Sequence, residues 1–409
     1  MPLFLLLVLF EKWYGWRKGF DTVRTLDMVS SLSSGVTNST KDVLGLSVAI
    51  ISYGWLVKHM AIMHIQATWL VYLIAFLTLD FAGYWTHRIA HTYNFFWNNH
   101  IVHHSSEEFN LACALRQSIS VFVRIYAFLL IPAAIFGVPE KVIAIVAPLH
   151  LFAQFWYHTR HIDRMGWLEQ VIVTPSHHRV HHAINPEYLD KNYGQIFIFW
   201  DRLFGTYQEE QAGIPAVYGV TRPVRTWNPI KINFMHLWLL IKDAWHTQSW
   251  KDKFRIWMMP LGWRPADVIE KYPVEKIEDV YHFEKYDTPA SKAMQVYLWI
   301  QLFCLLLLVS YFFGNVAMIK QLGISNLFLY GGFIFLQVYA LTDFMDGGKY
   351  AWILETIKNV ACIYAMDHYG QWFGSKIISP TITPILMGYF IFSTLAVYYF
   401  SKTNSPSKS

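Results

Sequence analysis

Twelve of the 18 histidines in this 409-residue chain lie between His87 and His182, and most of them are three or four residues apart. Such spacings place side chains on one face of a helix. Imidazole is the commonest transition-metal ligand in proteins. The candidate ligands are His87, His91, His100, His103, His104, His158, His178, His181 and His182. Because eight or nine imidazoles exceed what one ion needs, the pattern predicts a site for two metal ions.

Acidic side chains near these histidines could orient the rings. Asp80 shares a helical stripe with His87 and His91, and a carboxylate one or two turns from a ligating histidine can accept a hydrogen bond from its ring. Glu107 follows His100 by seven residues. The sequence leaves two roles open for Glu107, either this supporting role or that of a solvated surface residue.

A metal site has to be weighed against simpler roles for histidine. One pair of histidines four residues apart could equally be a buried pair or a proton relay, but three clusters on one predicted side of a membrane favour metal binding. His150 lies in an apolar run, so we expect it to be a buried structural residue. We expect the neighbouring His161 and His177 to be exposed.

The chain is too apolar for an ordinary soluble domain, with 54% hydrophobic residues, 15% charged residues and a mean hydropathy of +0.27. Apolar segments that suggest membrane helices recur along it. We therefore expect an all-α, polytopic integral membrane protein with eight or nine membrane helices. The candidate segments are 1–11, 43–57, 67–85, 119–137, 143–157, 293–313, 326–341, 352–373 and 383–400.

The positions of basic residues predict which side of the membrane holds the histidines. The segment 158–292 carries 17 of the 33 Lys and Arg residues, and loops rich in these residues face the cytoplasm. Basic residues within 17–41 assign the loop after the first segment to the same side. Two expected hairpins, 43–85 and 119–157, then return the chain to that side. All the clustered histidines are therefore expected at the cytosolic surface.

We expect four parts along the chain. Residues 1–157 form an N-terminal membrane half, 158–290 a cytosol-facing segment, 291–400 a C-terminal membrane half and 401–409 a polar tail. The sequence contains no glycine-rich dinucleotide fingerprint and no nucleic-acid signature. Its three scattered cysteines form neither a disulfide framework nor a cysteine metal pair.

The histidine clusters resemble those of the fatty acid hydroxylase and sterol desaturase superfamily of non-haem di-iron membrane enzymes. Further stretches resemble the alkylglycerol monooxygenase family within it, from about residue 25 into the C-terminal membrane half. The stretches that carry this resemblance are 103–118, 154–159, 174–182, 190–194, 200–206, 217–221 and 354–356. The part that runs from Ser105 through Glu107 to Asn110 and the C-terminal helices distinguish this family from the wider superfamily.

The resemblance implies a set of site residues. Its iron ligands correspond to the eight histidines of the three clusters, and His158 fits a further ligand position. Related hydroxylases carry a histidine where this chain has Gln154, which leaves the ninth ligand and the coordination number open. The resemblance adds Glu107 and Asn110 as candidate catalytic residues, with Asp80 in a supporting role.

The resemblance also implies a reaction and its partners. An enzyme of this kind uses two iron ions, O2 and a tetrahydropterin as external reductant. It hydroxylates the alkyl carbon next to the ether oxygen of a glyceryl ether lipid, and the product collapses to a fatty aldehyde and a glycerol derivative. The enzyme would lie in the endoplasmic reticulum of a eukaryote or the inner membrane of a bacterium.

Two other functions stay open at this point. A lipid or sterol desaturase or hydroxylase that uses a separate electron carrier would have the same histidine clusters. A non-enzymatic metal transporter is the second alternative. Transporters tend to hold their ligands in the middle of the membrane or in flexible loops, whereas these clusters are predicted to be helical and cytosolic.

Overall fold

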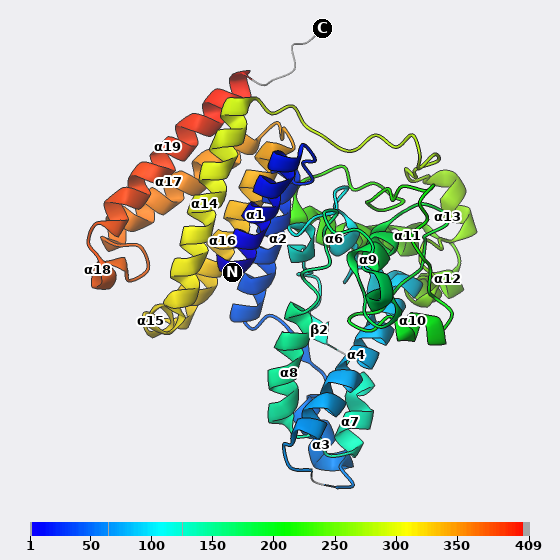
Figure 1. Cartoon of the computed structure of the whole chain (residues 1–409). Coiled ribbons are helices and arrows are strands. Elements are labelled where there is room, and N and C mark those ends of the chain that lie inside the picture. Colours follow the sequence, from blue (N-terminus) through cyan, green and yellow to red (C-terminus); the bar gives the residue numbers. More distant parts are fainter. Residues whose placement is uncertain (1, 64, 125, 404–409) are drawn as a thin grey trace. The chain divides into compact units, whose positions relative to one another are not determined.

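A computed structural model describes residues 2–63, 65–124 and 126–403 of the chain (Figure 1). Residues 404–409 of the expected polar tail lie outside this range, as do Met1 and Ile125 of two expected membrane segments. The described chain is helical as expected, apart from a two-residue parallel pair of strands, β1 (Val48–Ala49) and β2 (Val123–Arg124).

The chain forms two compact units. Unit 1 comprises Met1–Arg24, Ser47–Val224 and Ile232–Glu284, and unit 2 comprises Thr25–Leu46, Arg225–Lys231 and Lys285–Ser409. These units run across the boundaries of the four parts expected from the sequence. All the clustered histidines belong to unit 1.

Unit 1 is built around one long helix, α4 (Trp69–Thr92). The N-terminal half of α4 packs against α8 (Glu140–Phe152), and Val71, Ala75, Val142 and Val146 form the buried contact. Its C-terminal half carries the first two histidines. The other helices of unit 1 are α1 (Pro2–Lys18), α3 (Tyr53–Met60), α5 (Asn94–Trp97), α6 (Ile101–His104), α7 (Ile131–Ile135), α9 (Pro175–His182), α10 (Phe199–Leu203), α12 (Trp250–Arg255) and α13 (Ala266–Lys271). Helix α11 (Pro229–His246) begins in unit 2 and continues into unit 1. Unit 1 also contains four 3-10 turns, namely η1 (Cys113–Leu115), η2 (Tyr126–Leu130), η3 (Gly166–Gln170) and η4 (Ile256–Met258).

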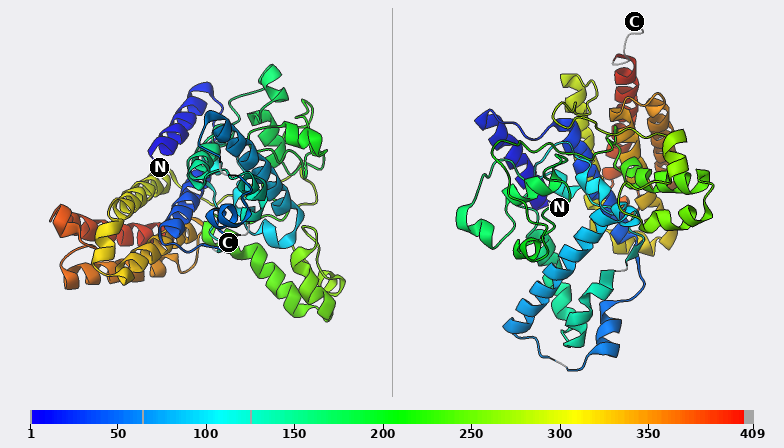
Figure 2. Two further views of the ribbon diagram at one scale, coloured as in Figure 1. Left: turned by 90° about the horizontal axis from the view of Figure 1, so that it is seen from below. Right: turned by 90° about the vertical axis from the view of Figure 1, so that its right-hand side faces the viewer.

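Unit 2 is a bundle of long helices that lie side by side (Figures 1 and 2). Its helices are α2 (Thr25–Val43), α14 (Lys292–Gly314), α15 (Val316–Gln321), α16 (Ile324–Met345), α17 (Ala351–Tyr369), α18 (Ser375–Ile378) and α19 (Ile382–Thr403). Apolar side chains of these helices, including Leu305, Ile334 and Phe390, form its core. Gly331 permits the close approach of Leu44, the residue that follows α2, to α16, because a Cβ atom at Gly331 would lie 2.5 Å from Leu44 Cδ1.

Four described helices are long and apolar enough to cross a membrane, namely α4, α14, α16 and α19. The protein is therefore an integral membrane protein, but the expected eight or nine spans are not shown. Most of the other expected segments fold as helices too short to span, since a crossing helix needs about 20 residues. Helices α3, α7 and α8 have 8, 5 and 13 residues. Apolar length alone could not predict where these segments turn.

A polar network lies inside the unit 2 bundle. The Lys358 amine donates to Glu355 Oε1 across 3.1 Å and to Gln337, and Glu355 Oε1 also accepts hydrogen bonds from Asn359 (3.0 Å) and Ser393 (2.7 Å). The side chains of Lys358 and Glu355 are 1% and 4% exposed. These contacts join helices α16, α17 and α19.

Removing one partner of this pair should destabilise the bundle, because the other charge would stay buried and unpaired. We expect Lys358→Met to lower the free energy of unfolding by about 3–5 kcal/mol. Adding Glu355→Gln to it should recover part of that loss. Thermal unfolding in detergent measures the effect, with the exposed Lys402→Met as the matched control. Equal stability of Lys358→Met and the control would contradict a tightly held ion pair.

Candidate di-metal centre

The nine candidate ligands come together in unit 1 as two groups, and within each group the possible ligand atoms lie within 4.8 Å of one another. The five-histidine group contains His87, His91, His100, His104 and His181. The four-histidine group contains His103, His158, His178 and His182. The groups adjoin, since the rings of His104 and His182 stack with centroids 4.3 Å apart. This arrangement suits two neighbouring ions, and the assignment of the individual ligands stays a prediction.

Short helices bring these rings together. Spacings of three and four on α9 direct His178, His181 and His182 toward the same side. Helix α9 starts with Pro175 at its first position, where proline fits because no backbone hydrogen bond is lost. Thr174 precedes it and forms a capping box with His177. The start of this two-turn helix is therefore well defined.

The spacing of the ring nitrogens fits bound ions. In the five-histidine group, His104 Nε2 lies 3.1 Å from both His91 Nε2 and His181 Nε2. In the four-histidine group, His178 Nε2 lies 2.9 Å from His158 Nε2 and 3.1 Å from His182 Nε2. Two nitrogens bound at about 2.1 Å and at right angles to each other are about 3 Å apart.

Backbone carbonyls fix which ring nitrogen carries the proton. Tyr193 O lies 2.9 Å from His87 Nδ1, Lys191 O lies 3.0 Å from His181 Nδ1, and Gln154 O lies 3.1 Å from His158 Nδ1. A carbonyl oxygen can only accept a hydrogen bond, so Nδ1 donates in each case. The Nε2 lone pairs of these neutral rings then point into the two groups, which is the tautomer that a metal requires.

Two further atoms in the five-histidine group lack a protein partner. His87 Nε2 and His100 Nε2 are buried and make no hydrogen bond with any described residue. Buried polar atoms in native proteins are nearly always satisfied. An ion bound among the five rings would satisfy both, so the residues present fit a metal at this position.

Burial keeps the rings uncharged. Outside the membrane-spanning helices, removal from water lowers the pKa of His158 to about 3 and lowers the pKa values of His104, His178 and His182 well below the ordinary value. Repulsion from neighbouring rings lowers the pKa values of His104, His178 and His182 further. The rings are therefore neutral at physiological pH, in the form that binds metal ions.

One backbone segment, Lys191–Phe197, supplies two of these carbonyls and is itself held by two buried carboxylates. Asp201 accepts hydrogen bonds from Tyr193 N and Gly194 N, each 2.7 Å long. Asp80 accepts from Ile196 N at 2.9 Å and Phe197 N at 3.2 Å. We call Lys191–Phe197 the carbonyl segment. Its position, and with it the orientation of the His87 and His181 rings, depends on these two acids.

Gly194 is required for the close approach of Asp201 to the carbonyl segment. A Cβ atom at Gly194 would lie 2.8 Å from Asp201 Oδ2 and 2.9 Å from Phe197 O. Both distances are shorter than real Cβ contacts. Any larger residue would therefore push the carbonyl segment away from Asp201.

Asp80 holds the backbone that orients two ligand rings, whereas its helical spacing had suggested a hydrogen bond to a ligand ring itself. Besides the carbonyl segment, it bonds His150 Nε2 at 2.8 Å and Trp200 Nε1 at 2.9 Å. His150 is buried, as its apolar surroundings predicted. The Gln154 side chain in turn lies 3.1 Å from His150 Nδ1 and belongs to neither histidine group.

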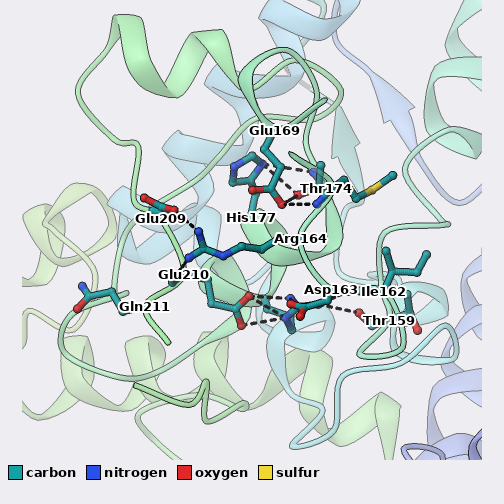
Figure 3. Close-up of polar contacts among 12 residues, drawn as sticks. Thr159, Ile162, Asp163, Arg164, Glu169, Thr174, His177, Glu209, Glu210 and Gln211 are labelled. Carbon is teal, nitrogen blue, oxygen red and sulfur yellow. Dashed lines mark hydrogen bonds and ion pairs between the residues drawn. The ribbon is translucent and has the colours of Figure 1, made fainter. Parts of the chain in front are cut away.

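Charged residues around α9 form the polar contacts drawn in Figure 3. Arg179 bonds both carboxylate oxygens of Glu210, and it donates to Ile162 O at 2.8 Å. Glu169 accepts from the Thr174 hydroxyl at 3.1 Å. His177, which the sequence led us to expect at the surface, is 1% exposed. That expectation was wrong because His177 caps the start of α9.

The other two candidate catalytic residues lie in the loop after α6. Asn110 is fully buried, and its amide donates to Thr22 O at 2.7 Å and accepts from Ala112 N at 3.0 Å and Cys113 N at 3.2 Å. These contacts fix the loop. Glu107 is half-buried beside Gly219. A catalytic role for either residue stays a prediction.

Sequence reasoning missed Glu11, which is buried in unit 1. Its two carboxylate oxygens accept hydrogen bonds from the Thr159 hydroxyl and from Leu111 N, both at 2.6 Å. Thr159 directly follows His158, so Glu11 ties helix α1 to the segment that carries this ligand. A lone acid within an apolar segment is costly without a partner, and that cost was the available signal.

Comparisons with known proteins agree with this site. The fatty acid hydroxylase family model matches residues 72–206, which include every histidine of both groups. The alkylglycerol monooxygenase of Homo sapiens is 34% identical over 87% of this chain and 79% of its own length. That of Danio rerio is 33% identical over 96% of this chain and 86% of its own length. An ornithine lipid hydroxylase of Rhizobium tropici is 28% identical over 37% of this chain and 46% of its own length. No solved structure matches the chain.

Loss of a ligand should remove one ion from the pair. We expect His104→Ala to lower bound metal from about two ions per chain toward one and to abolish turnover, while the protein stays folded because its helices pack elsewhere. Elemental analysis and thermal unfolding measure both effects. His246→Ala, outside both groups, should retain two ions. Wild-type metal content in His104→Ala would count against the two-group assignment.

Asp201→Asn should weaken metal binding at the five-histidine group. The two carboxylate oxygens of Asp201 accept hydrogen bonds from Tyr193 N and Gly194 N, and in the variant an amide nitrogen, which cannot accept, would face one of these N–H groups. We expect a loss of metal affinity of about 10–100-fold, the usual size for residues that orient ligands. Competition with a chelator measures it.

The matched control for Asp201→Asn is Asp243→Asn, since Asp243 is also a buried acid of unit 1 and pairs with Arg264 rather than with the carbonyl segment. It should destabilise the fold without selective metal loss. If both variants lose metal equally, Asp201 stabilises the fold in general and does not orient His87.

Proposed function

This chain belongs to the alkylglycerol monooxygenase family, since it is about one-third identical to members in two vertebrates over most of their length. From that premise we propose that it hydroxylates the alkyl carbon next to the ether oxygen of a glyceryl ether lipid. The hemiacetal formed collapses to a fatty aldehyde and a glycerol derivative.

The observation that carries this proposal is the pair of adjoining histidine groups. Neutral nitrogen ligands without thiolates suit an oxygen-activating site, because O2 would attack a thiolate. When bound there, two iron ions supply the redox chemistry that inserts one atom of O2 into an unactivated C–H bond. If each group held one six-coordinate iron ion, its five or four histidines would leave at least one position open for O2.

The chain's own residues then have distinct tasks. The carbonyl segment and Gln154 O hold the Nδ1 protons of three rings and so keep the Nε2 atoms directed at the ions. Phe109 and Tyr157 flank the four-histidine group, with ring centroids 5.3 Å from His182 and 4.4 Å from His178 respectively. Such aromatic walls exclude water from the site. Glu107 and Asn110 are our candidate catalytic residues.

The reaction requires two electrons and two protons besides O2, because the second oxygen atom leaves as water. We propose a tetrahydropterin as the external donor, on the basis of family resemblance. We also propose that the site faces the cytosol, where such a donor would be present, and that the enzyme resides in the endoplasmic reticulum or a bacterial inner membrane. The basic segment 158–292 supports this orientation.

The test supplies iron-loaded protein with an alkylglycerol, O2 and a tetrahydropterin, and it measures fatty aldehyde. We expect aldehyde to form in step with pterin oxidation, and none to form with His104→Ala. The similarity to an ornithine lipid hydroxylase makes hydroxylation or desaturation of another lipid the alternative. A hydroxyl group or double bond in an acyl chain or sterol, supported by a separate electron carrier and without aldehyde, would establish that alternative. Metal release across the bilayer without O2 uptake would instead indicate a transporter.

A further inference from the structure

Helices α11 and α12 carry an exposed row of large apolar side chains. On α11, Trp238, Ile241 and Trp245 follow one another at spacings of three and four, and they are 59%, 41% and 81% exposed. The row continues with Trp250 and Phe254 on α12, at 72% and 74% exposed. We call these five residues the aromatic face. It lies in the segment that the sequence predicts to be outside the membrane.

Helix α11 is apolar on two sides, which is unusual for a helix that faces water. Leu239 and Leu240 on its other side are buried, at 7% and 1% exposed. A surface helix with one buried stripe normally carries polar residues on the opposite side. The aromatic face therefore indicates contact with a second apolar or amphipathic phase.

The backbone places the aromatic face beside the end of a membrane helix. Met259 O accepts from Asn94 N at 3.0 Å, and Leu261 N donates to Thr92 O at 2.8 Å. The Asn94 side chain also donates to Ile256 O at 3.1 Å and Trp263 O at 2.9 Å. Residues 256–263 directly follow α12, and Thr92 is the last residue of the candidate span α4. The segment after α12 is therefore joined to the end of α4 that carries His87 and His91.

Basic residues lie among the aromatic side chains. Lys242 and Lys251 are exposed, and the Lys253 amine lies 5.7 Å from the centre of the Trp250 ring. The one acid on α11, Asp243, is buried and paired with Arg264. Tryptophan with lysine is the composition of helices that lie in the headgroup layer, where the rings enter the acyl boundary and the amines meet anionic lipid.

We propose that the aromatic face lies in the headgroup layer of the bilayer, on the side where α4 ends, and contacts anionic phospholipid there. The segment after the third histidine cluster is thus in part a membrane-surface element. Helices α11 and α12 thereby hold the metal-binding region of unit 1 against the bilayer through the end of α4. This placement does not depend on which lipid reacts.

Spin-label accessibility tests the proposal on the full chain. Trp245→Cys and Phe254→Cys are labelled separately in protein whose Cys304 and Cys362 are replaced by Ala, since Cys113 is buried. The protein is placed in nanodiscs of phosphatidylcholine with a minority of phosphatidylserine. Collision with O2, which concentrates in lipid, is compared with collision with a water-soluble nickel chelate. Tyr281→Cys, 53% exposed in the 272–291 segment beside Asp279, is the control.

We expect both labels on the aromatic face to collide several-fold more with O2 than with the chelate, and the control label to show the reverse. Two independent labels guard against a local defect at one site, and retention of bound metal verifies folding of each variant. Higher chelate collision at both sites would overturn the proposal and indicate a face open for a soluble partner. Protection from both reagents with dipolar broadening between labels would also overturn it, and would indicate a second copy of the chain.

As a second readout on the unmodified chain, phosphatidylserine with a photoreactive group in its acyl chain should crosslink within 238–258. Absence of crosslinks there, with crosslinks present on α14 and α19, would contradict the contact with lipid.

Discussion

The site depends on neutral imidazole rings that are held with their ring nitrogens about 3 Å apart. His158 and His181 give their Nδ1 protons to backbone carbonyls, and their Nε2 atoms lie 2.9 Å from His178 Nε2 and 3.1 Å from His104 Nε2, respectively. The Nε2 lone pairs of His158 and His181 are therefore available to a cation, and burial disfavours protonation of the rings instead. The carbonyls, the acids behind them and the aromatic walls keep the rings in the geometry that suits two metal ions.

Buried acids do much of this work in unit 1. Asp80 and Asp201 hold the carbonyl segment, and Glu11 holds the segment around His158, while the partly exposed Glu210 holds Arg179 of α9. Each acid accepts two or more hydrogen bonds, which offset part of the cost of removing a carboxylate from water. Helix α4 serves both parts of the unit, since it is a candidate membrane span and its C-terminal half carries His87 and His91.

The sequence predicted which histidines come together because metal-binding histidines follow a regular spacing, and their roles as individual ligands stay a prediction. Histidines three and four residues apart are recognisable without any tertiary information, and all nine candidates fall in the two groups. The residues that orient the ligands show no such regular spacing in the sequence. Lys191 and Tyr193 contribute only backbone carbonyls, which any residue could supply, and Asp201 lies 114 residues from His87 in the chain. Asp80 was found by its helical spacing, but its partners on the carbonyl segment required the tertiary fold.

The membrane helices were predicted less well, for a related reason. Hydropathy measures whether a segment avoids water, and segments such as 119–137 and 143–157 do so by packing as short helices and turns against α4. The same average property describes a span, a buried hairpin and a surface helix. Trp245 and Phe254 show the converse case, because they are apolar side chains in a segment whose charge predicted that it lies outside the membrane.

The account is tested most directly by the positions of the metal ions themselves. An experimental structure of iron-loaded protein, with anomalous scattering recorded at the iron edge, should show two peaks per chain. One should lie among His87, His91, His100, His104 and His181, and the other among His103, His158, His178 and His182. A single peak shared by both groups, or iron bound elsewhere while these rings stay unliganded, would contradict it.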